Sequence, residues 1–151
     1  MTSRLKVAFL CYLSGILLLV VFGIVYLIRT EFMPYHAVAV GEKWAEVPIA
    51  FQVLTLALMR SVAGGFLAVA FLLLILLLVP FRRGQKWAQW TIPAGGLIIS
   101  AGSLYSTVSV ALNTSANPPW IAGVVGIILM FGGYVLSLGQ FENRSKRDRS
   151  N

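Results

Sequence analysis

The hydrophobic positions fall into four long runs separated by short polar stretches. The runs cover about residues 5–28, 48–79, 87–112 and 120–138, and none of them holds more than one charged side chain. A helix needs about 20 apolar residues to cross a hydrocarbon core of about 30 Å. The pattern therefore predicts an all-α integral membrane protein, folded as an antiparallel up-down-up-down bundle of four transmembrane helices.

Composition agrees with this pattern. Of 151 residues, 58% are hydrophobic and 11% are charged, whereas a soluble domain has about 25% charged residues. We expect one transmembrane domain, residues 1–140, followed by a basic cytoplasmic tail, residues 141–151. The net charge of +7 lies in short clusters beside the apolar runs, which indicates the lipid bilayer as partner and argues against nucleic acid.

The placement of Lys and Arg predicts the orientation of the bundle. Two lie near the N-terminus, three between residues 81 and 89 and four in the tail, whereas segment 29–47 has two beside three acids and segment 113–119 has none. Basic residues accumulate on the cytoplasmic side. The chain is thus predicted to be a multi-pass protein of the inner (plasma) membrane, with cytoplasmic N- and C-termini and an outer loop over residues 29–47.

The outer loop is the main polar segment. It holds the only histidine, His36, and three of the five acids, and Pro34 and Gly41 interrupt it. Both residues break helices, so an irregular segment with a short turn near residues 43–46 is expected.

Small residues recur at helical spacing in the first, second and fourth runs, where they allow helix backbones to approach each other closely. The predicted packing positions are Gly15, Gly23, Gly64, Gly65, Gly126 and Gly133. Because one compact bundle cannot easily bury all of them, they favour a structural or accessory role, with contacts to a membrane-protein partner or a second copy.

A different function class follows from Arg60, which interrupts the apolar run at about the depth of the outer interface. An arginine there can extend to headgroups or pair with Glu46, Glu42 or Glu31, a purely structural role. It can also line an outward-facing cleft that binds, carries or converts a lipid-like or anionic small molecule. The residues expected around such a cleft are Arg60, Gln52, His36, Glu46, Tyr105 and Thr107.

The sequence contains few residues that could support catalysis or bind a metal ion. Cys11 is the only cysteine and His36 the only histidine, so neither a thiolate cluster nor a two-histidine site can form within one chain. Scattered serines with one loop histidine do not make a nucleophile and base pair. No catalytic residue, metal ion or cofactor is predicted, and an enzyme is the less favoured class.

Several short motifs resemble a group of small bacterial four-helix inner-membrane proteins of unknown activity. The motifs are MPYH (33–36), GEKWAE (41–46), LALMR with the glycines that follow (56–65), PFRRGQKWA (80–88) and PPW (118–120). The resemblance implies a bacterial source and four membrane helices, and it assigns no site residue.

Overall fold

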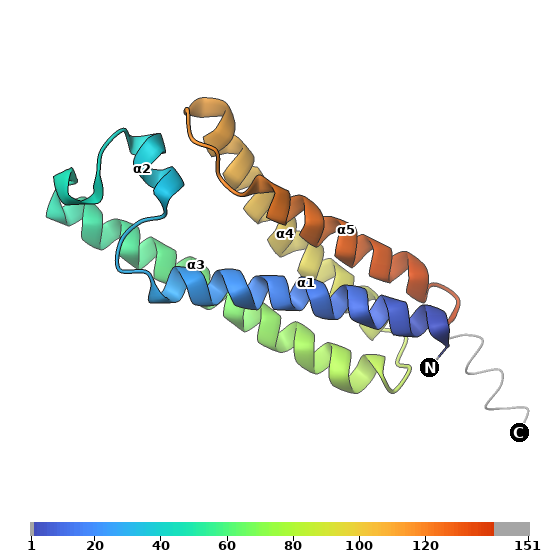
Figure 1. The fold of residues 1–151 in the computed structure, drawn as a ribbon. Helices are drawn as coiled ribbons and strands as arrows, with labels where there is room; N and C mark the ends of the chain where they lie inside the picture. The colour runs from blue at the N-terminus through green and yellow to red at the C-terminus, as the bar shows by residue number, and fades with distance from the viewer. Residues whose placement is uncertain (1, 141–151) are drawn as a thin grey trace, which may run out of the picture.

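The computed structural model describes residues 2–140, so the predicted tail, residues 141–151, lies outside the described residues. Four long helices dominate it (Figure 1). They are α1 (Ser3–Ile28), α3 (Ile49–Leu76, continued by the π-helical turn η2, Leu77–Phe81), α4 (Ala88–Asn113) and α5 (Trp120–Ser137). The helices pack antiparallel, which confirms the predicted all-α bundle, and all four are long and apolar enough to cross a membrane.

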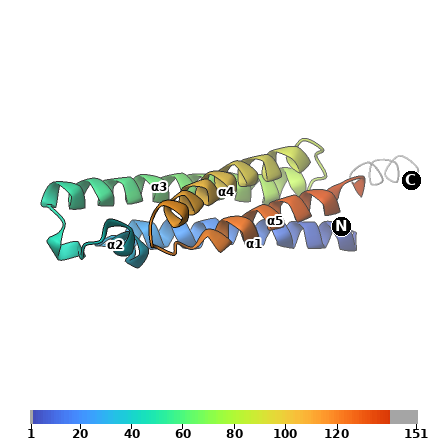
Figure 2. The ribbon, with the colours of Figure 1, turned by 90° about the horizontal axis from the view of Figure 1, so that it is seen from above.

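The bundle consists of two closely packed helix pairs. α1 packs along α3, α4 packs along α5, and the contact between α1 and α5 joins the pairs. The Thr2 hydroxyl donates a hydrogen bond to Gln140 Oε1 at 2.8 Å, so the two ends of the described chain meet. We call this the terminal end of the bundle and the opposite one the α2 end, after the short helix α2 (Pro34–Val40) that lies there (Figure 2).

The segment between α1 and α3 is more ordered than the sequence pattern predicts. Pro34 occupies the first turn of α2, where its missing N–H costs nothing. Gly41 follows the last turn with φ 81°, a left-handed conformation that glycine adopts without strain. The two supposed helix breakers are thus the ends of a helix. The turn expected near residues 43–46 is a 3₁₀ turn, η1 (Trp44–Glu46).

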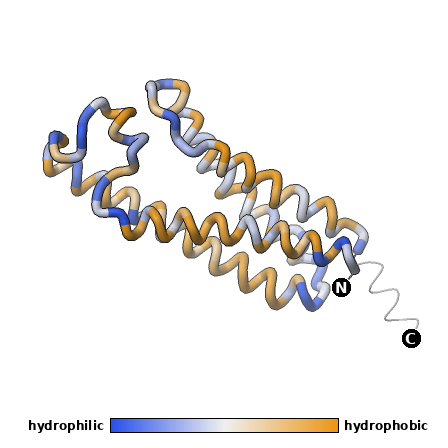
Figure 3. The backbone as a smooth tube through the Cα atoms, in the orientation of Figure 1, coloured by the Kyte–Doolittle hydropathy of each residue, from blue (hydrophilic) through white to orange (hydrophobic). Residues whose placement is uncertain are grey.

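The tightest core lies in the terminal half, where Tyr12, Ile16, Leu77, Ile92 and Met130 are fully buried. The rings of Tyr12 and Phe81 meet edge to face, with centroids 5.5 Å apart. Large apolar side chains on the outside of all four helices are exposed, and polar residues concentrate at the two ends of the bundle (Figure 3). This distribution is the one a lipid environment requires.

Four of the six predicted packing glycines lie at close helix contacts. A Cβ on Gly15, Gly23, Gly126 or Gly133 would come within 3 Å of a side chain on a neighbouring helix. Gly64 and Gly65 differ, because a Cβ there would meet nothing within 4 Å. These two glycines face outward on α3, so the close contact predicted for them is not made within the described chain.

The role of glycine in the α4–α5 contact can be tested at Gly123, where a Cβ would lie 3.1 Å from the backbone Cα of Leu104. Because backbone cannot rotate away, we expect Gly123→Ala to destabilise the protein by about 1–3 kcal/mol. The control is Gly64→Ala, which adds the same methyl group in open space. Thermal unfolding in mild detergent should show a lower midpoint for Gly123→Ala alone, and equal midpoints would refute the close backbone contact.

Candidate ligand cavity at the α2 end

The two helix pairs diverge toward the α2 end, as Figure 1 shows for the first turns of α3 and the α4–α5 connection. A cavity of about 910 Å³ lies between them, in the upper part of the range of about 300–1,000 Å³ that small-molecule sites occupy. All four long helices and α2 contribute to its lining. Most of that lining is apolar, including Leu18, Leu19, Phe22, Phe32, Val47, Phe51, Leu58, Met59, Val62, Phe66, Ile98 and Ile99.

The cavity opens sideways between α3 and α4. Leu58 and Val62 of α3 and Ile98 of α4 line it, yet their side chains are 59%, 45% and 75% exposed. Closer to the terminal end the two helices meet, since a Cβ on Gly95 would lie 3.2 Å from Leu73. The exposed lining residues therefore form the edge of an opening that faces the lipid side of the bundle.

Part of the polar lining is a row of hydroxyls on α4. Ser103, Ser106 and Thr107 are spaced three and four residues apart, so they share one face of the helix. The hydroxyl of Ser106 donates to the carbonyl oxygen of Gly102 at 3.0 Å, and that of Thr107 to the carbonyl oxygen of Ser103 at 2.9 Å. Such bonds to the preceding turn satisfy a hydroxyl proton in an apolar setting.

The segment that carries α2 and η1, residues 32–47, contributes to the lining at this end of the cavity and is held by α1 and α3. The hydroxyls of Tyr26 on α1 and Tyr35 on α2 share a hydrogen bond, and burial raises the pKa of Tyr35. Phe32 packs edge to face on Trp44, with centroids 4.9 Å apart. The Gln52 side-chain amide donates to the carbonyl oxygens of Trp44 and Val47, both at 2.9 Å. The Tyr26–Tyr35 bond thus ties α2 to α1, and Gln52 ties η1 to α3.

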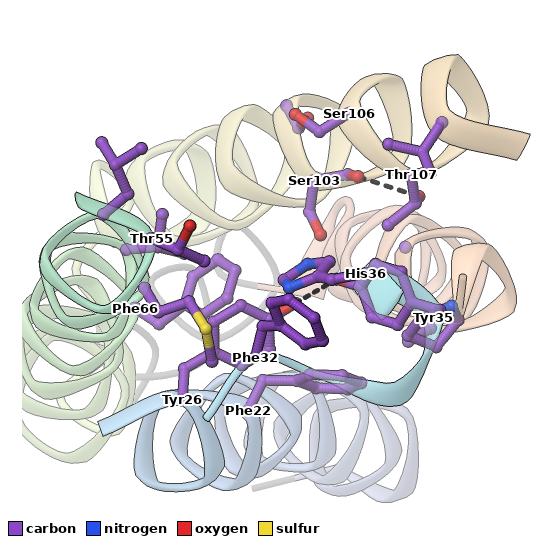
Figure 4. Close-up of a pocket in the computed structure, with 18 of the residues that line it drawn as sticks. Phe22, Tyr26, Phe32, Tyr35, His36, Thr55, Phe66, Ser103, Ser106 and Thr107 are labelled. Carbon is purple, nitrogen blue, oxygen red and sulfur yellow. Dashed lines mark hydrogen bonds between the residues drawn. The ribbon is translucent and has the colours of Figure 1, made fainter. Parts of the chain in front are cut away.

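His36 projects from α2 into the cavity (Figure 4). Its Nδ1 accepts a hydrogen bond from the backbone N–H of Met33 at 3.3 Å, which caps the start of α2. Burial lowers the pKa of His36, so the imidazole is neutral at pH 7. A neutral ring whose Nδ1 accepts carries its proton on Nε2.

Of the six residues predicted around a cleft, His36 and Thr107 line this cavity. Gln52 instead supports η1 as described, and the Glu46 carboxylate accepts a hydrogen bond from the Lys43 N–H at 3.2 Å, which caps η1. The side chain of Tyr105 is exposed and does not line the cavity.

Arg60 does not line the cavity either, and its side chain is exposed. At about 100° per residue, it lies about half a turn around α3 from the side formed by Leu58 and Val62. The sequence pattern missed Ser103 and the aromatic walls. An apolar residue that faces a cavity has the same periodicity as one that faces a core, so periodicity alone could not identify the aromatic walls.

Among residues 2–140, no group of three His, Cys, Asp or Glu side chains is placed to hold a metal ion. No protein-family model, curated protein or solved structure matches the chain. The geometry of the cavity therefore carries the functional argument.

Because His36 caps α2, the docking of α2 at the cavity is sensitive to acid. Because the pKa of His36 is lower in the docked state than its usual 6.5, docking of α2 is at full strength above that pH and weakens as the pH falls below it. Protonation also removes the Nδ1 acceptor for the Met33 N–H. We expect hydrogen-exchange protection of residues 34–40, corrected for intrinsic rates, to fall between pH 7.5 and pH 5.

The control for this prediction is His36→Gln. Glutamine at the same helix position can still accept from the Met33 N–H but does not titrate. Its protection should stay constant over the same range. Glu42 also lines the cavity, and an equal loss in both proteins would assign the effect to such a carboxylate and contradict the role given to His36.

Proposed function

We propose that the protein binds a lipid-like molecule, which enters from the bilayer through the opening between α3 and α4 and is held under α2. The observation that carries this proposal is the apolar cavity of about 910 Å³ with exposed lining residues at its lateral edge. A closed bundle with a structural role alone has no need of such a space. Binding or carriage is the activity that this cavity supports.

The charges of the lining favour an uncharged ligand over an anionic one. No lysine or arginine of the described chain lines the cavity, whereas the carboxylate of Glu42 does. A carboxylate or phosphate ligand would therefore lack a cationic partner there and would face a like charge. Arg60, on another side of α3, is better suited to contact lipid headgroups by extending toward the interface.

The position of the cavity along the bundle suits an amphipathic molecule. On α3 it extends from Phe66 to Phe51, which lie about 21 Å and about 43 Å from Pro80 at 1.5 Å per residue. A hydrocarbon core measures about 30 Å, and a bilayer with headgroups about 40–45 Å. One end of the cavity would then lie among acyl chains and the other among headgroups, as in a molecule with a tail and a polar end.

Retention of lipid tests this function. Val62→Trp places an indole in the opening, whereas Val53→Trp makes the same change at an exposed position of α3 outside the cavity. Steric overlap of about 1–3 kcal/mol should weaken binding roughly fivefold or more in the first variant and leave the second unchanged. Native mass spectra from mild detergent should show bound lipid in the wild type and Val53→Trp only. Equal retention in both variants would refute the site.

An accessory role in an assembly is a second candidate, and the outward face of α3 favours it. Ala57, Ser61, Gly64 and Ala68 are all exposed at helical spacing, and a Cβ at Gly64 would meet nothing within 4 Å. Another helix could approach this face closely. The same native mass spectra report copy number, so a strictly monomeric chain would count against contacts between copies.

For orientation we propose a multi-pass protein of a bacterial inner membrane with both termini in the cytoplasm, supported by the basic clusters at the terminal end. The cavity would then open toward the outer leaflet. Glu42 and Lys86, which mark the α2 end and the terminal end, are both exposed.

This orientation predicts a labelling pattern in single-cysteine variants made in a Cys11→Ala background. A membrane-impermeant maleimide applied to intact cells should label Glu42→Cys fully, whereas Lys86→Cys should react only after permeabilisation, because the bilayer blocks a charged reagent. The reverse pattern would invert the orientation and place the cavity in the inner leaflet.

A further inference from the structure

The cavity contains hydrogen-bond donors whose protons are not used by the protein. His36 Nδ1 accepts from the Met33 N–H, so the ring proton is on Nε2, and no hydrogen bond from Nε2 to another of residues 2–140 is present. The Ser103 hydroxyl makes no hydrogen bond within the same residues, unlike Ser106 and Thr107, whose hydroxyls donate to their own helix. In Figure 4 the His36 ring and the Ser103 hydroxyl both point into the cavity, from α2 and α4 respectively.

The donors of His36 and Ser103 are directed into one apolar space, where the hydroxyls of Thr55 and Ser100 also make no hydrogen bond among residues 2–140. This arrangement matches a particular ligand chemistry. A carbonyl oxygen has two lone pairs and can accept from both donors, whereas a hydrocarbon leaves both unpaired. An unpaired donor that loses its water on ligand binding is unfavourable, so the site discriminates against ligands without an acceptor.

We propose that the cavity selects an uncharged lipid with a carbonyl oxygen at its polar end, and that this oxygen accepts hydrogen bonds from His36 Nε2–H and the Ser103 hydroxyl. This inference rests on the proposed function. An ester carbonyl of a neutral glycerolipid and a ring carbonyl of a lipid quinone share this chemistry. Both keep a hydrophobic tail for the apolar walls formed by Phe22, Met59 and Phe66, and neither brings a charge toward Glu42.

The experiment compares matched probes on the purified full-length protein in detergent at pH 8. Dioctanoylglycerol has two ester carbonyls, and dioctylglycerol is the ether analogue without them. Dioctanoyl phosphatidic acid adds a negative charge, and decylubiquinone presents a quinone carbonyl. We expect the ester to bind about three- to tenfold more tightly than the ether, the difference that one or two hydrogen bonds supply. The phosphatidic acid should bind more weakly than either.

Two variants at position 36 separate hydrogen bonding from the structure of α2. Glutamine and glutamate both cap a helix at this position, so His36→Gln and His36→Glu both preserve the bond from the Met33 N–H. Only the glutamine amide can donate to a ligand. The preference for ester over ether should persist in His36→Gln and disappear in His36→Glu, and Ser103→Ala should reduce it.

The outcomes distinguish the two proposals. If wild-type protein binds none of the four probes, the proposed lipid-binding function fails, and this inference fails with it. Equal binding of ester and ether, equal behaviour of the Gln and Glu variants, or tightest binding of the phosphatidic acid would leave a lipid site but overturn the carbonyl selection. Tighter binding of decylubiquinone than of dioctanoylglycerol would support the inference and assign the carbonyl to a quinone.

Discussion

The structure depends on where small residues let helix backbones touch. In lipid, helices associate through close packing rather than through the release of water. The Met130 side chain of α5 lies against Gly15 of α1 and Gly96 of α4, and Gly133 lies against the Tyr12 ring. These contacts join the two helix pairs in the terminal half. Toward the α2 end, Gly23 and Gly123 hold each pair together internally, but no glycine contact within residues 2–140 joins one pair to the other there. The divergence of the pairs, and hence the cavity, follows from this distribution.

The sequence predicts a helix reliably only where its hydrophobic pattern is long. The four membrane helices follow from runs too long and apolar for any other fold. Helix α2 does not, because seven residues are too few for a periodic pattern and its stability comes from tertiary contacts such as the Tyr26–Tyr35 hydrogen bond. The outward position of Gly64 could not be predicted from the sequence either, since a small residue suits a helix contact and a lipid-facing surface equally well.

The residues of the candidate cavity could likewise be predicted only in part from the sequence. Gln52 and Arg60, both predicted around a cleft, are eight residues apart on α3, and eight steps of about 100° leave them about 80° apart around the helix. That angle is enough to direct Gln52 under η1, where it bonds two carbonyl oxygens, and to leave Arg60 exposed outside the cavity. His36 and Thr107 were also predicted around a cleft, and both line the cavity. The aromatic walls face a cavity because the helix pairs diverge, and the sequence pattern does not predict that divergence.

A cavity that opens to lipid differs energetically from one inside a soluble protein. In water, an apolar void costs lost contacts that only the protein can restore. Under the proposed function, acyl chains enter through the opening beside Val62 and restore them, so the cavity has little tendency to collapse. Polar atoms of the lining are not stabilised in this way, because an acyl chain offers them no hydrogen-bond partner. The hydroxyls of Ser106 and Thr107 are satisfied by their own helix, whereas His36 Nε2 and Ser103 depend on what enters. Selectivity in such a site therefore resides in its few unused donors rather than in its shape.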